Sequence, residues 1–219
     1  MIIATSRGIR KRPWDAFFMN SKPRSESDRI EYDFDTSPTL NVPGDWNSQS
    51  EKLFYYEGTI LYKRSFDYPE VEKGTRVFIR FGAVNYRADV YLNSIKLGIH
   101  TGGFTPFCFE VTGLLEPMNN ILIVKVDNSR KREGVPTLNT DWWNYGGITR
   151  GVTIIETPAT FVSDYTIRLK KDDPGILEGN VALDGPGAGE ACVTLSIPEL
   201  GLRHTLTTDP GGPSHLRSR

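Results

Sequence analysis

Apolar and polar residues alternate along most of the chain from residue 30 onward. In the clearest run, 59–68, the side chains of Tyr62 and Phe66 share one face with other apolar residues. Alternation with a period of two, carried by β-branched and aromatic residues, is typical of a half-buried β-strand. The same pattern predicts further strands at 30–35, 76–81, 86–92, 107–111 and 122–126.

Turn-forming residues separate these runs, and no long stretch holds the 3.6-residue period of an amphipathic helix. Gly102-Gly103, Asn119-Asn120 and Gly146-Gly147 lie between runs and favour turns. Strands that are not interleaved with crossover helices favour antiparallel pairing over a parallel α/β sheet. The predicted fold class is therefore all-β, with strands stacked as an antiparallel sandwich.

The pattern divides the chain into three parts. Residues 1–29 are polar, contain two prolines and are expected to be poorly regular. Their aromatic residues Trp14, Phe17 and Phe18 are expected to pack against the main domain. Residues 30–158 are expected to form the main β-domain. Residues 159–219 are expected to form a partial immunoglobulin-like sandwich, because a complete one needs about seven strands over about 100 residues. Its predicted strands are 161–170, 177–183, 191–197 and 202–207, followed by an irregular end at 210–219.

Composition and charge narrow the range of partners. The 219 residues carry a formal net charge of −1, which gives no reason to expect a nucleic acid or an anionic membrane as partner. No apolar run reaches the length of a membrane span. Cys108 and Cys192 lie far apart, so neither a disulfide nor a thiolate metal site is expected, and the periplasm and the cytoplasm both stay open for a soluble protein. No catalytic residue, metal ligand or cofactor is nominated, because the histidines are dispersed and no nucleophile, phosphate-binding or dinucleotide motif is present.

Aromatic and polar side chains are concentrated in two places, 41–47 followed by 55–58, and 139–150. Aromatic rings pack against the C–H faces of pyranose sugars, and carboxylate and amide groups hydrogen-bond to sugar hydroxyls. Asp141 and Asn144 are therefore candidates for sugar contacts. The alternative is that these segments are structural, and for Trp46 a place in the core is the favoured interpretation.

Four ordered motifs resemble the N-terminal sugar-binding domain of glycoside hydrolase family 2, which includes β-galactosidases, β-glucuronidases and β-mannosidases. They are LNVPGDWN (40–47), YYEGTILYKRSF (55–66), the Gly- and Phe-containing stretch 90–107, and TDWWNYGGITRGV (140–152). The resemblance covers about residues 38–160. Its last motif is most similar to the corresponding segment of β-glucuronidases.

The resemblance implies a jelly-roll, galactose-binding-like β-sandwich followed by the start of an immunoglobulin-like domain. It also implies that the catalytic glutamates belong to a separate TIM barrel, which needs about 250 residues. The chain by itself is therefore expected to be inactive. In β-glucuronidase-like members, the aspartate at the position of Asp141 reaches the sugar pocket, so the resemblance gives Asp141, and secondarily Asn144, a substrate-binding role.

Three hypotheses follow. The chain is the non-catalytic front portion of a retaining β-glycosidase of the β-glucuronidase or β-galactosidase type, a stand-alone carbohydrate-binding sandwich, or a structural sandwich used in assembly. The first is favoured because the second domain has too few strands. It implies a β-glycoside substrate and a catalytic barrel as partners, with a homo-oligomer as a further possibility.

Overall fold

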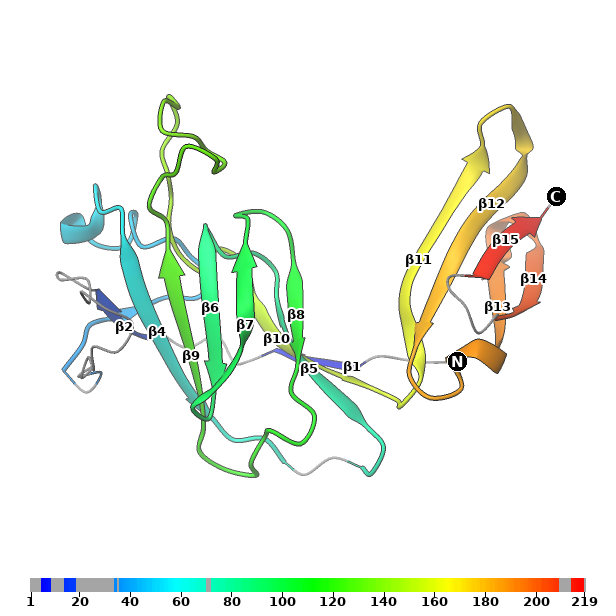
Figure 1. Ribbon diagram of the computed structural model, residues 1–219, viewed down its shortest axis with the longest axis horizontal. Helices are drawn as coiled ribbons and strands as arrows, with labels where there is room; N and C mark the ends of the chain where they lie inside the picture. Colours follow the sequence, from blue (N-terminus) through cyan, green and yellow to red (C-terminus); the bar gives the residue numbers. More distant parts are fainter. Residues whose placement is uncertain are drawn as a thin grey trace. The chain divides into compact units, whose positions relative to one another are not determined.

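The computed structural model describes residues 5–8, 14–18, 34, 36–69, 72–208 and 214–218, and these residues are almost entirely β-strand and loop (Figure 1). The described helices are three single 3-10 turns, η1 (Glu51–Leu53), η2 (Ala188–Glu190) and η3 (Pro198–Leu200). None of them is long and apolar enough to cross a membrane. The chain divides into two compact units, of which the larger spans Ser6–Lys73 and Val77–Glu156.

The larger unit contains a six-stranded sheet in the order β3-β2-β4-β9-β6-β7. Within it, all the strand pairings are antiparallel. The strands are β2 (Trp14–Phe18), β3 (Thr39–Leu40), β4 (Thr59–Phe66), β6 (Arg87–Leu92), β7 (Ile95–Thr101) and β9 (Asn120–Asp127). The antiparallel arrangement, predicted because no crossover helices separate the strands, is thus confirmed.

A four-stranded sheet in the order β1-β10-β5-β8 provides the other layer of the sandwich (Figure 1). Its strands are β1 (Thr5–Gly8), β5 (Arg76–Phe81), β8 (Phe107–Glu110) and β10 (Val152–Thr157). β5 and β8 pair in antiparallel fashion from Phe78↔Glu110 to Phe81↔Phe107.

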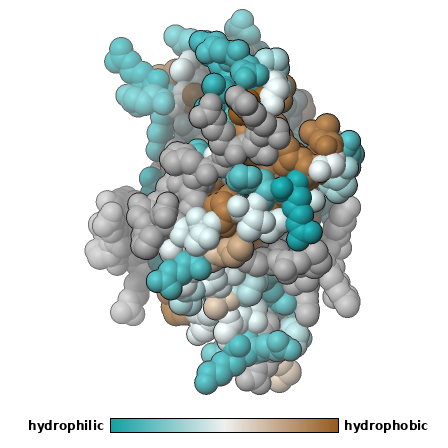
Figure 2. Space-filling model, turned by 90° about the vertical axis from the view of Figure 1, so that its right-hand side faces the viewer, coloured by the Kyte–Doolittle hydropathy of each residue, from teal (hydrophilic) through white to brown (hydrophobic). Residues whose placement is uncertain are grey.

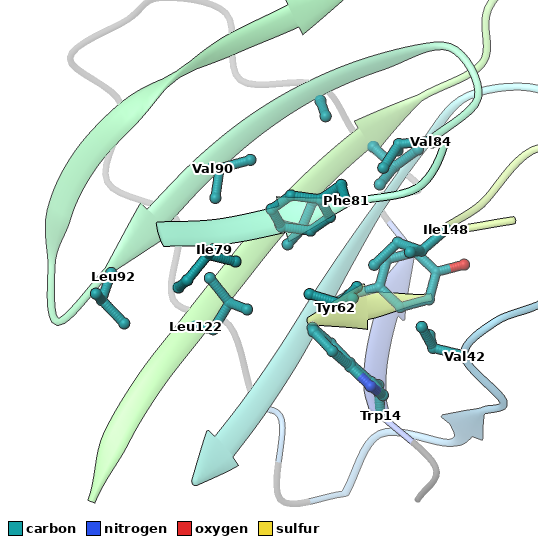
Figure 3. Packing of buried hydrophobic residues seen from close by; sticks show 14 of the residues in the cluster. Trp14, Val42, Tyr62, Ile79, Phe81, Val84, Val90, Leu92, Leu122 and Ile148 are labelled. Carbon is teal, nitrogen blue, oxygen red and sulfur yellow. The ribbon is translucent and has the colours of Figure 1, made fainter. Parts of the chain in front are cut away.

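The hydrophobic core lies between these two sheets and is built from alternate residues of each strand (Figure 3). In β5, β6 and β9 the inward-facing alternate residues are buried, and these residues are Val77, Ile79, Phe81, Ala88, Val90, Leu92, Leu122, Val124 and Val126. Burying an aliphatic or phenylalanine side chain contributes roughly 1.5–3 kcal/mol to stability. The period-two pattern is therefore the sequence feature that fixes which face of each strand points inward.

The smaller unit, mainly Thr157–Arg219, contains a three-stranded sheet, β11-β12-β15, and a separate pair, β13-β14. Its strands are β11 (Phe161–Lys170), β12 (Asp173–Asp184), β13 (Cys192–Ile197), β14 (Leu202–Thr207) and β15 (Ser214–Ser218). Among its described residues, the buried hydrophobic side chains are Ile176 and Val181. On the face shown in Figure 2, hydrophobic and hydrophilic side chains are interspersed. This unit therefore has much less core than the larger one.

Some predicted elements differ from the observed ones. The segment 1–29, expected to be poorly regular, contains β1 and β2, and Trp14 of β2 is buried in the core. The end of the chain, expected to be irregular, contains β15, which pairs with β12. Strands β7 and β10 were not predicted, and the strand expected at 30–35 falls mostly outside the described residues.

Candidate functional site

The two aromatic and polar segments singled out in the sequence lie side by side in the structure. The backbone N–H of Gly44 donates to the carbonyl of Ile148 at 2.9 Å, and that of Trp46 donates to the carbonyl of Gly146 at 2.9 Å. The 139–150 segment is also bonded to Asn85, which exchanges backbone hydrogen bonds of 2.9 and 3.1 Å with Gly147. Residues far apart in the sequence therefore form one connected cluster of loops.

Trp46 belongs to the core of this cluster, as the favoured interpretation predicted. Its indole is fully buried, and its Nε1 donates to the carbonyl of Tyr56 at 3.2 Å. Gly146 lies directly against the ring, since a Cβ atom added there would come 2.1 Å from Trp46 Cζ2. Glycine is thus needed at this position for the two segments to approach each other.

Buried asparagines hold the loops together. Asn47 donates through Nδ2 to the carbonyls of Leu53 at 3.0 Å and Tyr56 at 3.1 Å, and its Oδ1 accepts from the N–H of Gly146 at 2.9 Å. Asn128 donates from Nδ2 to the carbonyl of Asn144 at 2.9 Å. Buried amides bonded on both sides replace the water that loop backbone would otherwise require.

Asn144 is part of this buried network. It is only 4% exposed, its Nδ2 donates to the carbonyl of Asn128, and its Oδ1 accepts from Asn85 Nδ2 at 3.1 Å. Both polar atoms of its side chain therefore already have protein partners. A buried amide that gives up such partners to reach a ligand loses their hydrogen-bond energy.

Asp141 has the opposite surroundings. It lies at the exposed part of the 139–144 segment, and within the described part of the chain no residue is hydrogen-bonded or ion-paired to its carboxylate. An exposed carboxylate on an anchored loop is free to accept hydrogen bonds from a ligand. The structure thus separates the two candidates, with Asp141 facing solvent and Asn144 facing the interior.

Arg130 and Glu57 were not nominated as site residues from the sequence, although Glu57 lies in the polar and aromatic stretch 55–58. Arg130 Nε donates to Glu57 Oε1 at 2.9 Å, and its Nη1 donates to the carbonyl of Thr140 at 3.3 Å. The two residues are 73 positions apart. Only the pairing of β4 with β9 brings them to the same end of the sheet, so a pattern search along the sequence could not have found the pair.

An exposed aromatic patch, defined as Phe54, Tyr55, Trp143 and Tyr145, lies in the same loop cluster. Ring centroids are 5.4 Å apart for Tyr55 and Trp143, 4.9 Å for Phe54 and Trp143, and 6.4 Å for Trp143 and Tyr145. Tyr55 is 81% exposed. Exposed aromatic clusters of this kind mark interaction surfaces more often than core.

Two rings of this patch, Tyr55 and Trp143, line a cavity of about 170 Å³. Its lining residues combine two rings with polar groups: Asn47, Tyr55, Glu57, Arg130, Trp143 and Asn144. The rings of Tyr55 and Trp143 can pack against the C–H faces of a sugar, whereas Arg130 and Glu57 are paired with each other. Fold and site together define a β-sandwich domain with an aromatic and polar loop cluster at one end of its strands.

Comparison with known families agrees with this class. Residues 11–158 match the family described as "Glycosyl hydrolases family 2, sugar binding domain". The match covers more than half of the 219 residues, and the chain belongs to this family. The resemblance found in the sequence motifs is thereby confirmed.

Curated relatives include β-glucuronidases from bacteria and mammals. The chain is 35% identical over 153 residues to a β-glucuronidase of Formosa agariphila, a match that covers 62% of this chain and 16% of that protein. It is 27% identical over 184 residues to the human β-glucuronidase, covering 69% of this chain and 28% of that protein. The chain thus spans less than a third of the length of either relative.

Solved structures show the same fold. A β-glucuronidase of Bifidobacterium dentium, complexed with coumarin-3-O-glucuronide, superposes with a TM-score of 0.78 at 24% identity, covering 98% of this chain and 42% of that one. A putative β-galactosidase of Bacteroides fragilis superposes with a TM-score of 0.71 at 23% identity, covering 98% of this chain and 35% of that one. The arrangement of strands is therefore shared with proteins named as a β-glucuronidase and as a β-galactosidase.

Proposed function

We propose that this chain is the non-catalytic N-terminal portion of a β-glycosidase of the β-glucuronidase or β-galactosidase type, and that it shapes the sugar pocket of that enzyme. The bond cleavage itself takes place on a catalytic barrel that is not among these 219 residues. Within the proposed enzyme, residues 30–158 are the sugar-binding domain and residues 159–219 begin an immunoglobulin-like one. The names of the relatives and the family assignment support the enzyme class.

The observation that carries the proposal is the exposed carboxylate of Asp141 on a loop anchored at both ends. The anchors are the Arg130 side chain on one side and the buried Asn144 on the other. We assign Asp141 to the sugar hydroxyls and Asn144 to holding the loop. A fixed acceptor strengthens substrate binding because little loop entropy is lost when the ligand arrives.

Replacing Asp141 by Ala in the full-length enzyme tests this assignment. A hydrogen bond to a charged group is worth about 1.5–3 kcal/mol, so kcat/KM for an aryl β-glycoside should fall about ten- to 150-fold. Glu133→Ala is the matched control, because Glu133 is an exposed carboxylate on the same stretch after β9. Equal kinetics for Asp141→Ala and Glu133→Ala would remove Asp141 from the pocket.

A stand-alone carbohydrate-binding module is the second candidate, and the exposed aromatic patch favours it. Exposed aromatic rings can pack against a sugar without help from a catalytic domain. Calorimetric titration of the chain with glucuronic acid and galactose separates the two candidates. The β-glycosidase proposal expects millimolar affinity or none, because most walls of the pocket belong to the barrel, whereas micromolar binding would favour the stand-alone module.

A further inference from the structure

Arg130 and Glu57 lie next to each other because of the register between β4 and β9. The two strands pair with Thr59 opposite Asp127 at this end of the sheet. Glu57 stands shortly before β4 and Arg130 shortly after β9, so both lie at the same end of these two central strands. Their side chains form an ion pair of 2.9 Å between Arg130 Nε and Glu57 Oε1.

The rest of the Arg130 guanidinium is turned toward the loop that carries Asp141. Nη1 donates to the carbonyl and to Oγ1 of Thr140, both at 3.3 Å. Nη2 donates to the carbonyl of Trp142 at 3.5 Å. These two carbonyls belong to the residues immediately before and after Asp141.

Partial burial makes this contact more than a flexible surface pair. The Arg130 side chain is 22% exposed and the Glu57 side chain 37% exposed. Charged hydrogen bonds gain strength as water is removed from around them, and a guanidinium uses its planar fork to bond several acceptors at once. Lysine has a single ammonium group and cannot span the carboxylate and both carbonyls in the same way.

We propose that Arg130, oriented by Glu57, is a positioning residue that fixes the backbone on either side of Asp141. This inference rests on the proposed function, since it gives Arg130 a role in substrate recognition only through Asp141. Neither residue is assigned a contact with the sugar. The pair sets the direction of the Asp141 carboxylate, and the buried Asn144 fixes the far end of the loop.

A positioning role and a purely structural role make different predictions. An ion pair that is partly open to solvent contributes little to global stability, so Arg130→Gln should change the midpoint of thermal unfolding only slightly. A misplacement of a binding group by about 1 Å can cost up to about a hundredfold in rate. Loss of kcat/KM with little loss of stability is therefore the expected result for Arg130→Gln and for Glu57→Gln.

A double-mutant cycle in the full-length enzyme tests the inference. The variants are Arg130→Gln, Asp141→Ala and their combination, with Arg132→Gln as the control because Arg132 is an exposed cation two residues along. If Arg130 acts through Asp141, the first substitution lowers kcat/KM about tenfold or more in the parent but has no further effect in the Asp141→Ala background. Arg130→Lys should restore only part of the lost activity.

Hydrogen exchange of the backbone amides at 137–143 gives a second readout that needs no substrate. Faster exchange of these amides in Arg130→Gln, but not in Arg132→Gln, would support the anchoring. Unchanged exchange would overturn it. So would equal losses of kcat/KM in the parent and Asp141→Ala backgrounds, in which case the role of Asp141 itself would still stand. If Asp141→Ala alone left kcat/KM unchanged, the proposed function itself would be contradicted, whatever result hydrogen exchange gave.

Discussion

Among single residues, Tyr62 places a phenol hydroxyl in the hydrophobic core. Its hydroxyl is buried without a hydrogen-bond partner among the described residues, close to Gly147. Burial, and secondly the negative charge of Asp45, raise the pKa of the Tyr62 phenol well above its ordinary value. An unpaired buried hydroxyl costs about 1–3 kcal/mol, so the ring, not the hydroxyl, is what stabilises this position.

Tyr62→Phe is therefore expected to leave the free energy of unfolding unchanged or to raise it. The pKa of Tyr62 is higher in the folded than in the unfolded chain, so ionisation favours unfolding. The free energy of unfolding is therefore unaffected by Tyr62 ionisation below the ordinary pKa of about 10 and falls as the pH rises above that value. The variant should lose less stability than the parent between pH 9 and pH 11. Urea denaturation across this pH range measures the free energy of unfolding of both proteins. A Tyr62→Phe variant less stable than the parent at neutral pH would show that the hydroxyl has a hydrogen-bond partner.

Burial also distinguishes the two candidate site residues. Asp141 and Asn144 are both polar and three positions apart, yet one faces solvent and the other is buried with both amide atoms bonded. The sequence could nominate the pair but could not assign the roles. The assignment depends on Asn85 and Asn128, which reach Asn144 from other strands and loops.

At the scale of elements, the site depends on how closely two loop segments approach each other. Trp46 lies against Gly146, and backbone hydrogen bonds join the segments at Gly44 and Ile148. The Asp141 loop is tied to Arg130, just beyond the end of the central strand β9. A side chain at Gly146 would have to displace the indole ring.

Gly146→Ala is expected to destabilise the chain by about 1–3 kcal/mol, the usual cost of forcing extra volume into a packed core. Gly151→Ala is the matched control, because a Cβ there meets nothing within 4 Å. The free energies of unfolding of both variants can be compared by urea denaturation, with Trp fluorescence as the probe. Equal stabilities would mean that the two segments are not as tightly packed as this account requires.

Alternation predicted the central strands well, because β5, β6 and β9 bury every second residue against the opposite sheet. It did not predict β7, an edge strand whose residues Ile95 and Ile99 are exposed and whose partner strand has an irregular register at Val90. An edge strand is stabilised by its neighbour more than by its own pattern. Arg130 and Glu57 were missed for a similar reason, since strand pairing alone makes them neighbours.

At the scale of the whole molecule, the two units differ in how much apolar surface they bury. The larger unit has a continuous core between two sheets, whereas the strands of β13 and β14 have no fully buried residue. Local stability follows buried apolar contact, and regions with few such contacts open at lower free-energy cost. The sugar-binding sandwich is thus expected to be the stable part of the chain.

Amide hydrogen exchange should reveal this difference. Backbone amides of β4, β6 and β9 should be protected at least about tenfold more strongly than those of β13 and β14. Ile79→Ala, which creates a cavity in the larger unit only, should speed exchange in the first group and leave the second unchanged. Uniform protection across both units would contradict the account.

The central claim is that this sandwich supplies Asp141 to a sugar pocket completed by another domain. A crystal structure of the full-length protein with a bound β-glycoside tests it most directly. We expect an Asp141 carboxylate oxygen to lie about 2.5–3.2 Å from a hydroxyl of the bound sugar, with Arg130 still bonded to the carbonyls beside it. A sugar bound with Asp141 more than about 4 Å from every hydroxyl would contradict the claim.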